Sequence, residues 1–212
     1  MTGNEDLLAH LLDAGEMRLQ RSGLPDSPPP PLAPAPQWDR VEGMLLGLAI
    51  GDSLGNTSEG QLPAERARSH GEIRDYLPNR YAEGRAVGVP SDDTQLAFWT
   101  LEQLLCDGQL NPAHLAARFC REPIFGIGQA VKAFVENYRG GLQPWHRCAP
   151  HSAGNGALMR IAPVVLPHLR TPSSALWADV ALAALVTHND ATSISACLAW
   201  VNILWQLLGM SS

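Results

Sequence analysis

Residues 43–55 read GMLLGLAIGDSLG and carry a glycine at every fourth position, with mostly apolar residues between the glycines. A spacing of four places these glycines on one face of an α-helix. Each interior glycine costs about 1 kcal/mol of helix propensity relative to alanine, so we expect another group to approach this face closely. Tight packing of a neighbouring helix is the expected explanation, and direct approach of a ligand is the alternative.

The apolar pattern from Trp38 onward stays mostly helical. Few stretches show the alternating, β-branched pattern that is typical of strands. The sequence therefore predicts an all-α, compact multi-helix domain over residues 38–212. The expected helices cover residues 39–54, 94–107, 111–121, 126–138, 157–166, 174–186 and 191–209.

The first 37 residues have a different composition. Leu8, Leu11, Leu12 and Leu19 recur at near-helical spacing and predict a short amphipathic helix within residues 5–20. Prolines then follow at positions 25, 28–31, 34 and 36, and their fixed backbone angle favours an extended, semi-rigid linker. We expect a plain spacer, with a ligand for an SH3-type domain as the alternative. Residues 1–37 are thus predicted to form a short helix and a proline-rich linker ahead of the domain.

The overall charge excludes some classes of partner. The 212 residues carry a formal net charge of −6, so no positive field attracts nucleic acid or an anionic membrane, and we expect neither partner. The four cysteines show no metal-binding spacing, and the acids Glu5 and Asp6 are unlike the start of a secretory signal. A reduced, cytoplasmic protein is expected.

Ser91-Asp92-Asp93-Thr94 forms a dense group of oxygen atoms ahead of an apolar-periodic run. Such a position marks the start of a helix, where Ser and Asp commonly cap the first amides, and capping alone would explain these residues. A metal site is the alternative, because Mg²⁺ and Mn²⁺ prefer hard oxygen ligands. From these residues alone both interpretations stay open.

Two further acids accompany the glycine-rich stretch. Asp52 could cap or pair within the fold, and Glu59 lies in the short polar loop formed by residues 56–60. A loop of this kind can bring a carboxylate over a site, although a solvated glutamate is the simpler alternative.

Glycine-rich turns offer backbone amides to an anion. The turn Gly154-Asn155-Gly156 precedes an apolar run, and amides freed at such a junction can hold a phosphate, with added charge from Arg160. Gly126 and Gly128 form a similar, weaker helix entry. The turn lacks the Lys and Ser/Thr of a phosphate-binding P-loop, so a plain loop is the alternative.

His188 lies in the polar tetrad Thr187-His188-Asn189-Asp190, between two apolar helices. Polar groups in such a place need partners if they are buried. Helix capping by Asn189 or Asp190 explains most of the tetrad, and contact of His188 with a ligand is the alternative.

The last expected helix is apolar around nearly its whole circumference from Ile194 to Met210. A helix of this kind is buried or lies in lipid. Asn202 and Gln206 argue against a membrane span. We therefore expect burial, which needs a cover from this fold or from a partner chain.

The order of these motifs is more specific than any one of them. GMLLGLAIGDSLG with Glu59, then SDDTQLA, then GNGALMRIAP and then THND resembles the ADP-ribosylglycohydrolase family, which includes the dinitrogenase-reductase-activating hydrolases. The resemblance covers about residues 39–205. It implies a compact all-α fold that holds two magnesium or manganese ions at the base of an ADP-ribose cleft.

The resemblance also implies roles for individual residues. Ser91, Asp92 and Asp93 would be metal ligands, and Glu59, Asp92 and Asp93 would serve catalysis, with Glu59 reaching the reactive ribose from its loop. The substrate-binding residues would be Gly126, Gly128, Gly154, Asn155, Gly156 and Arg160 at the diphosphate or ribose, and His188 at the distal ribose.

The implied reaction is metal-dependent hydrolysis of the glycosidic bond between ADP-ribose and a protein side chain such as arginine or serine. The partner would be an ADP-ribosylated protein or a small ADP-ribose derivative. Two alternatives are a catalytically inactive ADP-ribose-binding or interaction module and a magnesium-dependent phosphoesterase.

One departure from the family pattern concerns the metal pair. Family members carry a late Asp-x-Asp-Thr motif that completes the pair, whereas Asp190 is the last acid of this sequence. The uncovered apolar helix at residues 194–210 points the same way. We therefore expect a family member that is incomplete at its C-terminal side, and self-association through this exposed helix.

Overall fold

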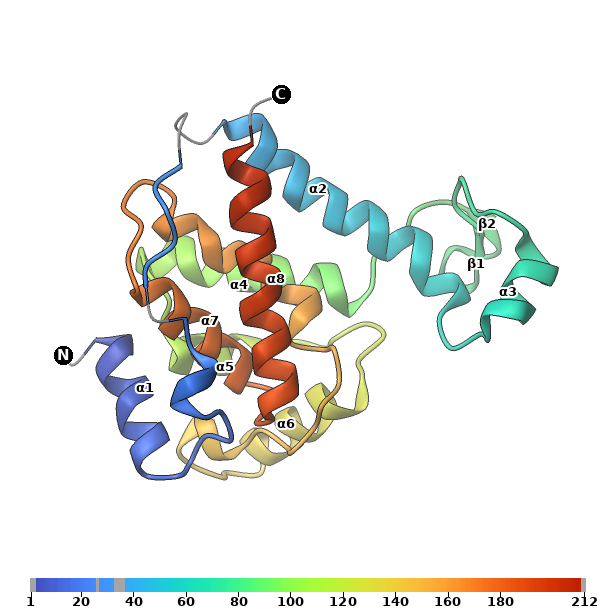
Figure 1. Ribbon diagram of the computed structural model, residues 1–212. Coiled ribbons are helices and arrows are strands. Elements are labelled where there is room, and N and C mark those ends of the chain that lie inside the picture. Colours follow the sequence, from blue (N-terminus) through green and yellow to red (C-terminus); the bar gives the residue numbers. More distant parts are fainter. Residues whose placement is uncertain (1–2, 26, 33–36, 211–212) are drawn as a thin grey trace.

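The computed structural model describes residues 3–25, 27–32 and 37–210, which are predominantly helical and confirm the predicted all-α class (Figure 1). One two-stranded antiparallel sheet pairs Pro78 with Ala86 and Asn79 with Arg85. The α-helices are α1 (Asn4–Asp13), α2 (Trp38–Gly55), α3 (Pro63–His70), α4 (Asp92–Asp107), α5 (Pro112–Phe119), α6 (Gln129–Arg139), α7 (Ala175–Leu185) and α8 (Ala191–Gly209). The strands are β1 (Pro78–Asn79) and β2 (Arg85–Ala86), and the 3₁₀ turns are η1 (Arg21–Gly23), η2 (Asn56–Ser58), η3 (Arg80–Ala82), η4 (Trp145–Arg147), η5 (Leu158–Arg160) and η6 (Ala162–His168).

Helix α7 is the centre of the hydrophobic core. Every residue from Leu176 to Leu185 is buried, and the helix packs against α1, α8 and η6. Its alanines let these neighbours approach closely, and each fully buried leucine or valine contributes about 1.5–3 kcal/mol. This helix fixes the positions of the residues that follow it, from Thr187 to Asp190.

Helix α8 has the predicted bounds but is buried on one face only. Ile194, Val201 and Trp205 are fully buried, whereas Ile203 and Leu207 are 47% and 49% exposed. The fold alone therefore does not supply the expected cover for the whole circumference, and one apolar face of α8 stays exposed. By length and composition α8 could cross a membrane, but core helices of soluble proteins pass the same test, and 44% of its apolar window is buried in the fold.

The N-terminal segment packs on the same core. The helix predicted within residues 5–20 ends at Asp13, because the chain turns at Gly15, which has a φ of +67°. The carbonyls of Ser27 and Pro30 accept hydrogen bonds from the indoles of Trp177 and Trp205, at 2.7 and 2.8 Å. Residues 27–32 thus lie against α7 and α8 and are not a detached spacer.

The remaining linker prolines, Pro34 and Pro36, lie outside the described residues. The division of the chain at residue 37 stays a prediction.

Two other stretches differ from the prediction. Residues 157–166, expected as one α-helix, form the 3₁₀ turns η5 and η6, because Pro163 and Pro167 lack the amide donors that an α-helix needs. Helix α3 was not predicted, since its sequence PAERARSH has no apolar periodicity. Proline at its first position and Glu65 in its first turn were the signals available.

The glycine face of α2 is open. Helix α2 leaves the bundle near the C-terminal end of α8 and projects away from it, with α3, β1 and β2 at its far end (Figure 1). A Cβ atom added at Gly43, Gly47, Gly51 or Gly55 would meet nothing within 4 Å. The expected packing of a neighbouring helix on this face is therefore wrong for the part of the chain that is described.

A largely apolar groove of about 640 Å³ lies between α2 and α8, and we call it the α2–α8 groove. Gly43 and Gly47 form one wall, and Trp200 and Leu207 belong to the other. Leu46 and Ile50 of α2 are also about half exposed beside it. Exposed apolar area of this kind favours association with another surface.

We predict that the chain self-associates through the exposed face of α8. The double substitution Ile203→Glu with Leu207→Glu places two charges on that face, so the mass measured by light scattering after gel filtration should fall to that of a monomer. Leu105→Glu, at a position on α4 that is 76% exposed, is the matched control and should leave the mass unchanged. A wild-type chain that stays monomeric at high concentration would contradict the prediction.

Candidate active site

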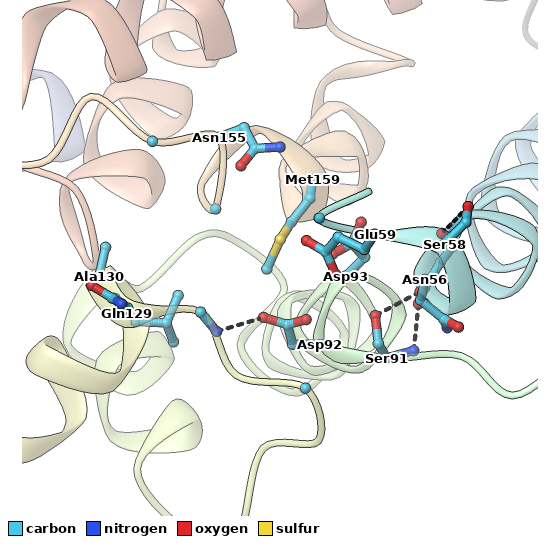
Figure 2. A pocket seen from close by; sticks show the side chains of 18 of the residues that line it. Asn56, Ser58, Glu59, Ser91, Asp92, Asp93, Gln129, Ala130, Asn155 and Met159 are labelled. Atoms are coloured by element: carbon cyan, nitrogen blue, oxygen red, sulfur yellow. Dashed lines mark hydrogen bonds between the residues drawn. The ribbon is translucent and has the colours of Figure 1, made fainter. Parts of the chain in front are cut away.

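A cavity of about 670 Å³ opens between the C-terminal end of α2, the N-terminal end of α4, the loop before α6 and the loop before η5. Figure 2 shows Glu59, Asp92 and Asp93 on one side of it and Asn155 with Met159 on the facing side. All of the predicted site residues except Arg160 line this cavity: Glu59, Ser91, Asp92, Asp93, Gly126, Gly128, Gly154, Asn155, Gly156 and His188.

Asp52 of α2 caps helix α4. Its Oδ2 accepts hydrogen bonds from the backbone amides of Ser91 and Thr94, at 2.7 and 3.1 Å, and from the Thr94 hydroxyl at 2.6 Å. Its Oδ1 accepts the Ser91 hydroxyl, also at 2.6 Å. Ser91 is the N-cap residue but its own side chain caps no amide. The capping expected of the Ser91 cluster itself is thus performed by Asp52, which leaves Asp92 and Asp93 for the cavity.

The same hydrogen bonds control the ionisation of Asp52. Burial alone would raise the pKa of this carboxyl, but the donors from Ser91 and Thr94 outweigh burial and hold the pKa below its usual value of 3.8. Asp52 is therefore ionised at neutral pH and contributes negative charge to the base of the cavity.

Asp92 and Asp93 respond in the opposite direction. Burial, together with the negative charges of Glu59 and Asp52, raises the pKa of Asp92 to about 6, against the backbone hydrogen bonds from Gly128 and from its own amide. Burial and the charges of Asp52, Asp92 and Glu59 raise the pKa of Asp93 to about 6 as well. The carboxylates are close enough to repel one another, and a bound cation would relieve this repulsion.

The glycine-rich loop before α6 closes over the start of α4. Gly126 has a φ of +76°, and a Cβ atom there would lie 3.2 Å from the Ser91 Cβ. The amide of Gly128 donates to Asp92 Oδ2 at 3.2 Å (Figure 2). The missing side chain of Gly126 therefore permits a close approach of backbone to the acid cluster, and Gly128 contributes its amide.

The turn Gly154-Asn155-Gly156 packs against the ring of His188. A Cβ atom on Gly156 would lie 2.9 Å from His188 Cε1, and one on Gly154 would lie 3.6 Å from Nε2. The absence of side chains at these two positions lets the imidazole lie against the turn. Asp190 caps α8 by accepting the amides of Thr192 and Ser193, as the capping alternative predicted, while His188 lines the cavity.

The position of Arg160 differs from the prediction. Its side chain is fully buried in the core and bonds to the Ala183 carbonyl and the Thr187 hydroxyl, at 2.9 and 2.7 Å. The residue belongs to η5, whose turn directs this side chain into the core, whereas the adjacent Met159 lines the cavity.

Several lining residues were not predicted: Arg66, Gln129, Ser152 and Met159. Gln129 directly follows the predicted Gly128, and Ser152 lies two residues before the predicted Gly154, so their proximity in sequence was a usable signal. Arg66 comes from α3, whose polar sequence gave no indication of a site.

The residues of the acid cluster are of the chemical type that binds divalent cations. Ser91, Asp92 and Asp93 present hard oxygen atoms under mutual repulsion, which matches the preference of Mg²⁺ and Mn²⁺. Within residues 3–25, 27–32 and 37–210, however, no group of three or more His, Cys, Asp and Glu side chains is arranged to hold a metal ion.

We predict that Asp52→Asn destabilises the fold by about 2 kcal/mol, because the amide can satisfy fewer of the donors at the start of α4. Urea denaturation followed by circular dichroism measures this change. Asp75→Asn, in an exposed loop, is the matched control and should cost about 0.5 kcal/mol or less.

The contribution of Asp52 to the stability of the fold should also depend on pH. Since the folded-state pKa lies below 3.8, the ionised carboxylate contributes its full stability above that value, and the contribution is lost as the pH falls through the lower, folded-state pKa. The difference in free energy of unfolding between the wild type and Asp52→Asn should therefore become smaller at acidic pH. An undiminished difference would contradict this origin of the stability.

Several known proteins are similar to this chain in sequence. The chain matches the ADP-ribosylglycohydrolase family over residues 33–212. An ADP-ribosylarginine hydrolase of Pseudomonas putida is 32% identical over 180 residues, which are 78% of this chain and 46% of that protein. The ADP-ribosyl-[dinitrogen reductase] glycohydrolase of Rhodospirillum rubrum is 31% identical over 178 residues, which are 81% of this chain and 58% of that protein.

A more distant relative is an ADP-ribosylhydrolase of Xenopus tropicalis, 27% identical over 173 residues that cover 75% of this chain and 47% of that protein. The chain spans about half the length of the curated relatives it matches. The match extends over most of the helical domain and includes every residue of the cavity. The chain therefore belongs to the ADP-ribosylglycohydrolase family.

Proposed function

We propose that this protein hydrolyses the bond between ADP-ribose and a protein side chain. The observation that carries the proposal is one cavity with clustered carboxylates on one wall and a glycine turn with a histidine on the other. The volume of about 670 Å³ lies within the usual range for small-molecule sites. The names of the relatives from Pseudomonas putida and Rhodospirillum rubrum, hydrolases of ADP-ribosyl groups, support the same reaction.

The charges of the cavity determine how ADP-ribose would lie in it. Asp52, Asp92, Asp93 and Glu59 repel an anion, so the diphosphate belongs near the amides of the Gly154-Asn155-Gly156 turn. Arg66 also lines the cavity and offers a positive charge to the diphosphate. The reactive ribose, which develops positive charge as its glycosidic bond breaks, then belongs beside the carboxylates.

The acids also provide the proton transfers that hydrolysis requires. The bond between the anomeric carbon and the side-chain nitrogen or oxygen breaks, a water oxygen bonds to that carbon, and the leaving atom gains a proton. Glu59 lies on an exposed loop at the edge of the cavity and is our candidate for the carboxylate that accepts the proton of the water.

Ser91, Asp92 and Asp93 would hold the divalent ions, for which we propose Mg²⁺ or Mn²⁺. When bound, such ions orient ribose hydroxyls and lower the pKa of a water molecule. Asp52 and the Gly128 amide keep these ligands in place from behind. A cytoplasmic location and the absence of nucleic-acid partners stay predictions from the sequence.

We predict that Asp92→Asn lowers the rate of ADP-ribose release by at least about 100-fold, because the variant removes a carboxylate that would hold a divalent ion beside the reacting ribose. Release from arginine- and serine-modified proteins is measured by chromatography, with Mg²⁺ or Mn²⁺ added. The amide oxygen can still accept the Gly128 hydrogen bond, so folding should be preserved. Asp75→Asn, which has the same change of charge away from the cavity, should match the wild type.

The alternatives give different results in the same assays. Binding of ADP-ribose by calorimetry with no release from any modified protein would favour the inactive binding module. Magnesium-dependent release of phosphate from simple phosphoesters would favour a phosphoesterase. Turnover without divalent metal would refute the proposed metal dependence.

A further inference from the structure

Arg160 is a buried cation whose position needs an explanation. Its side chain is fully buried, makes no ion pair with a carboxylate in the described residues, and leaves Nε and Nη1 without hydrogen-bond partners. Burial lowers the pKa of Arg160 to about 10, so the guanidinium still carries its charge at neutral pH. The Phe119 ring, 4.8 Å from Cζ, gives some compensation. Burial of a charge under these conditions is unfavourable.

Thr187 connects this cation to the cavity. Arg160 Nη2 donates to the Thr187 hydroxyl at 2.7 Å, and the same hydroxyl lies 2.9 Å from His188 Nδ1. Arginine can only donate, so the hydroxyl oxygen accepts from Arg160 and its own hydrogen remains to be placed. Thr187 is fully buried, so its hydroxyl hydrogen needs an acceptor inside the protein. Among the hydrogen bonds of the described residues, His188 Nδ1 is the acceptor that this hydroxyl reaches.

We propose that Arg160, acting through Thr187, fixes His188 as the neutral tautomer that carries its proton on Nε2, so that the ring always presents a hydrogen-bond donor to the cavity. Arg160 and Thr187 are then positioning residues, and His188 is the group that touches the ligand. The identity of the ligand as ADP-ribose rests on the proposed function, but the tautomer does not.

The other forms of the ring are disfavoured by the same contacts. A proton on Nδ1 would leave the buried Thr187 hydroxyl without an acceptor. A doubly protonated ring would add a second positive charge near Arg160. Burial and the Arg160 charge lower the pKa of His188 to about 4, against the opposing charge of Asp190.

The Nε2 atom faces the glycine turn and the cavity. It lies 3.2 and 3.6 Å from where Cβ atoms on Gly156 and Gly154 would be, and both glycines line the cavity with it. No protein acceptor for Nε2 is found among the hydrogen bonds of residues 3–25, 27–32 and 37–210. The acceptor must therefore come from within the cavity, from water in the free protein or from a ribose or phosphate oxygen of bound ADP-ribose. This geometry selects an oxygen acceptor at this point and rejects a group that can only donate.

Nuclear magnetic resonance of the imidazole nitrogens in the whole chain tests the tautomer directly. Long-range ¹H–¹⁵N correlation distinguishes a protonated from an unprotonated ring nitrogen, and the spectrum of His188→Gln identifies the signals. We expect wild-type His188 to show protonated Nε2 and unprotonated Nδ1 at neutral pH. Thr187→Ser, which keeps the hydroxyl, should retain this pattern, whereas Thr187→Val should give a mixture of tautomers.

Arg160→Met should give a mixture as well, while Arg160→Lys, which still donates to Thr187, should retain the wild-type pattern. If the buried substitution prevents folding, the Thr187 pair still decides the question. A wild-type ring protonated on Nδ1, or an unchanged pattern in Thr187→Val, overturns the inference.

Binding of ADP-ribose, measured by calorimetry, is the second readout. Thr187→Val should bind about fivefold to tenfold more weakly, because in part of the molecules His188 Nε2 is unprotonated and cannot donate to the ligand oxygen. Thr187→Ser should bind like the wild type. Equal affinity of Thr187→Val and wild type would overturn the role of the tautomer in binding. A fixed tautomer with tight binding but no release of ADP-ribose supports the inference and contradicts the proposed hydrolysis.

Discussion

The carboxylate of Asp52 joins two helices at the point where the cavity begins. By satisfying the first amides and hydroxyls of α4, it fixes the direction of Ser91, Asp92 and Asp93 relative to α2. A helix capped by its own residues would use these oxygens internally. Because the cap comes from another helix, the acid cluster remains available, and burial together with its neighbouring negative charges raises the pKa values of Asp92 and Asp93. The chemistry of the site depends on this one contact.

The two walls of the cavity follow from different properties of the sequence. On one wall, acids are concentrated at the start of α4 and at the end of α2. On the other wall, glycines remove side chains and expose amides, and the histidine between them is kept neutral by its surroundings. A ligand with one anionic part and one part that becomes cationic during reaction fits this separation of charge. Neither wall alone would orient such a ligand.

Sequence periodicity predicted α8 and most other helices well, because their apolar positions face a common core. It failed at η5 and η6, where Pro163 and Pro167 override the pattern, and at α3, which buries no apolar residue. Motif order led to all the lining residues of the acid cluster and the glycine turns. Capping or pairing by Asp52 was expected, but its partner, the start of α4, was not predicted, and neither was the burial of Arg160. Each depends on which side chains meet across elements that lie far apart in the chain.

The indole contacts of the N-terminal segment have a consequence for the order of folding. The partners Ser27 with Trp177 and Pro30 with Trp205 are separated by 150 and 175 residues. During synthesis the proline-rich segment is made before α7 and α8, so its carbonyls gain these donors only after both helices have been made. Loop closure over such distances is slow and entropically costly. These two contacts therefore join the proline-rich segment to the last two helices, and they complete only when α7 and α8 are present.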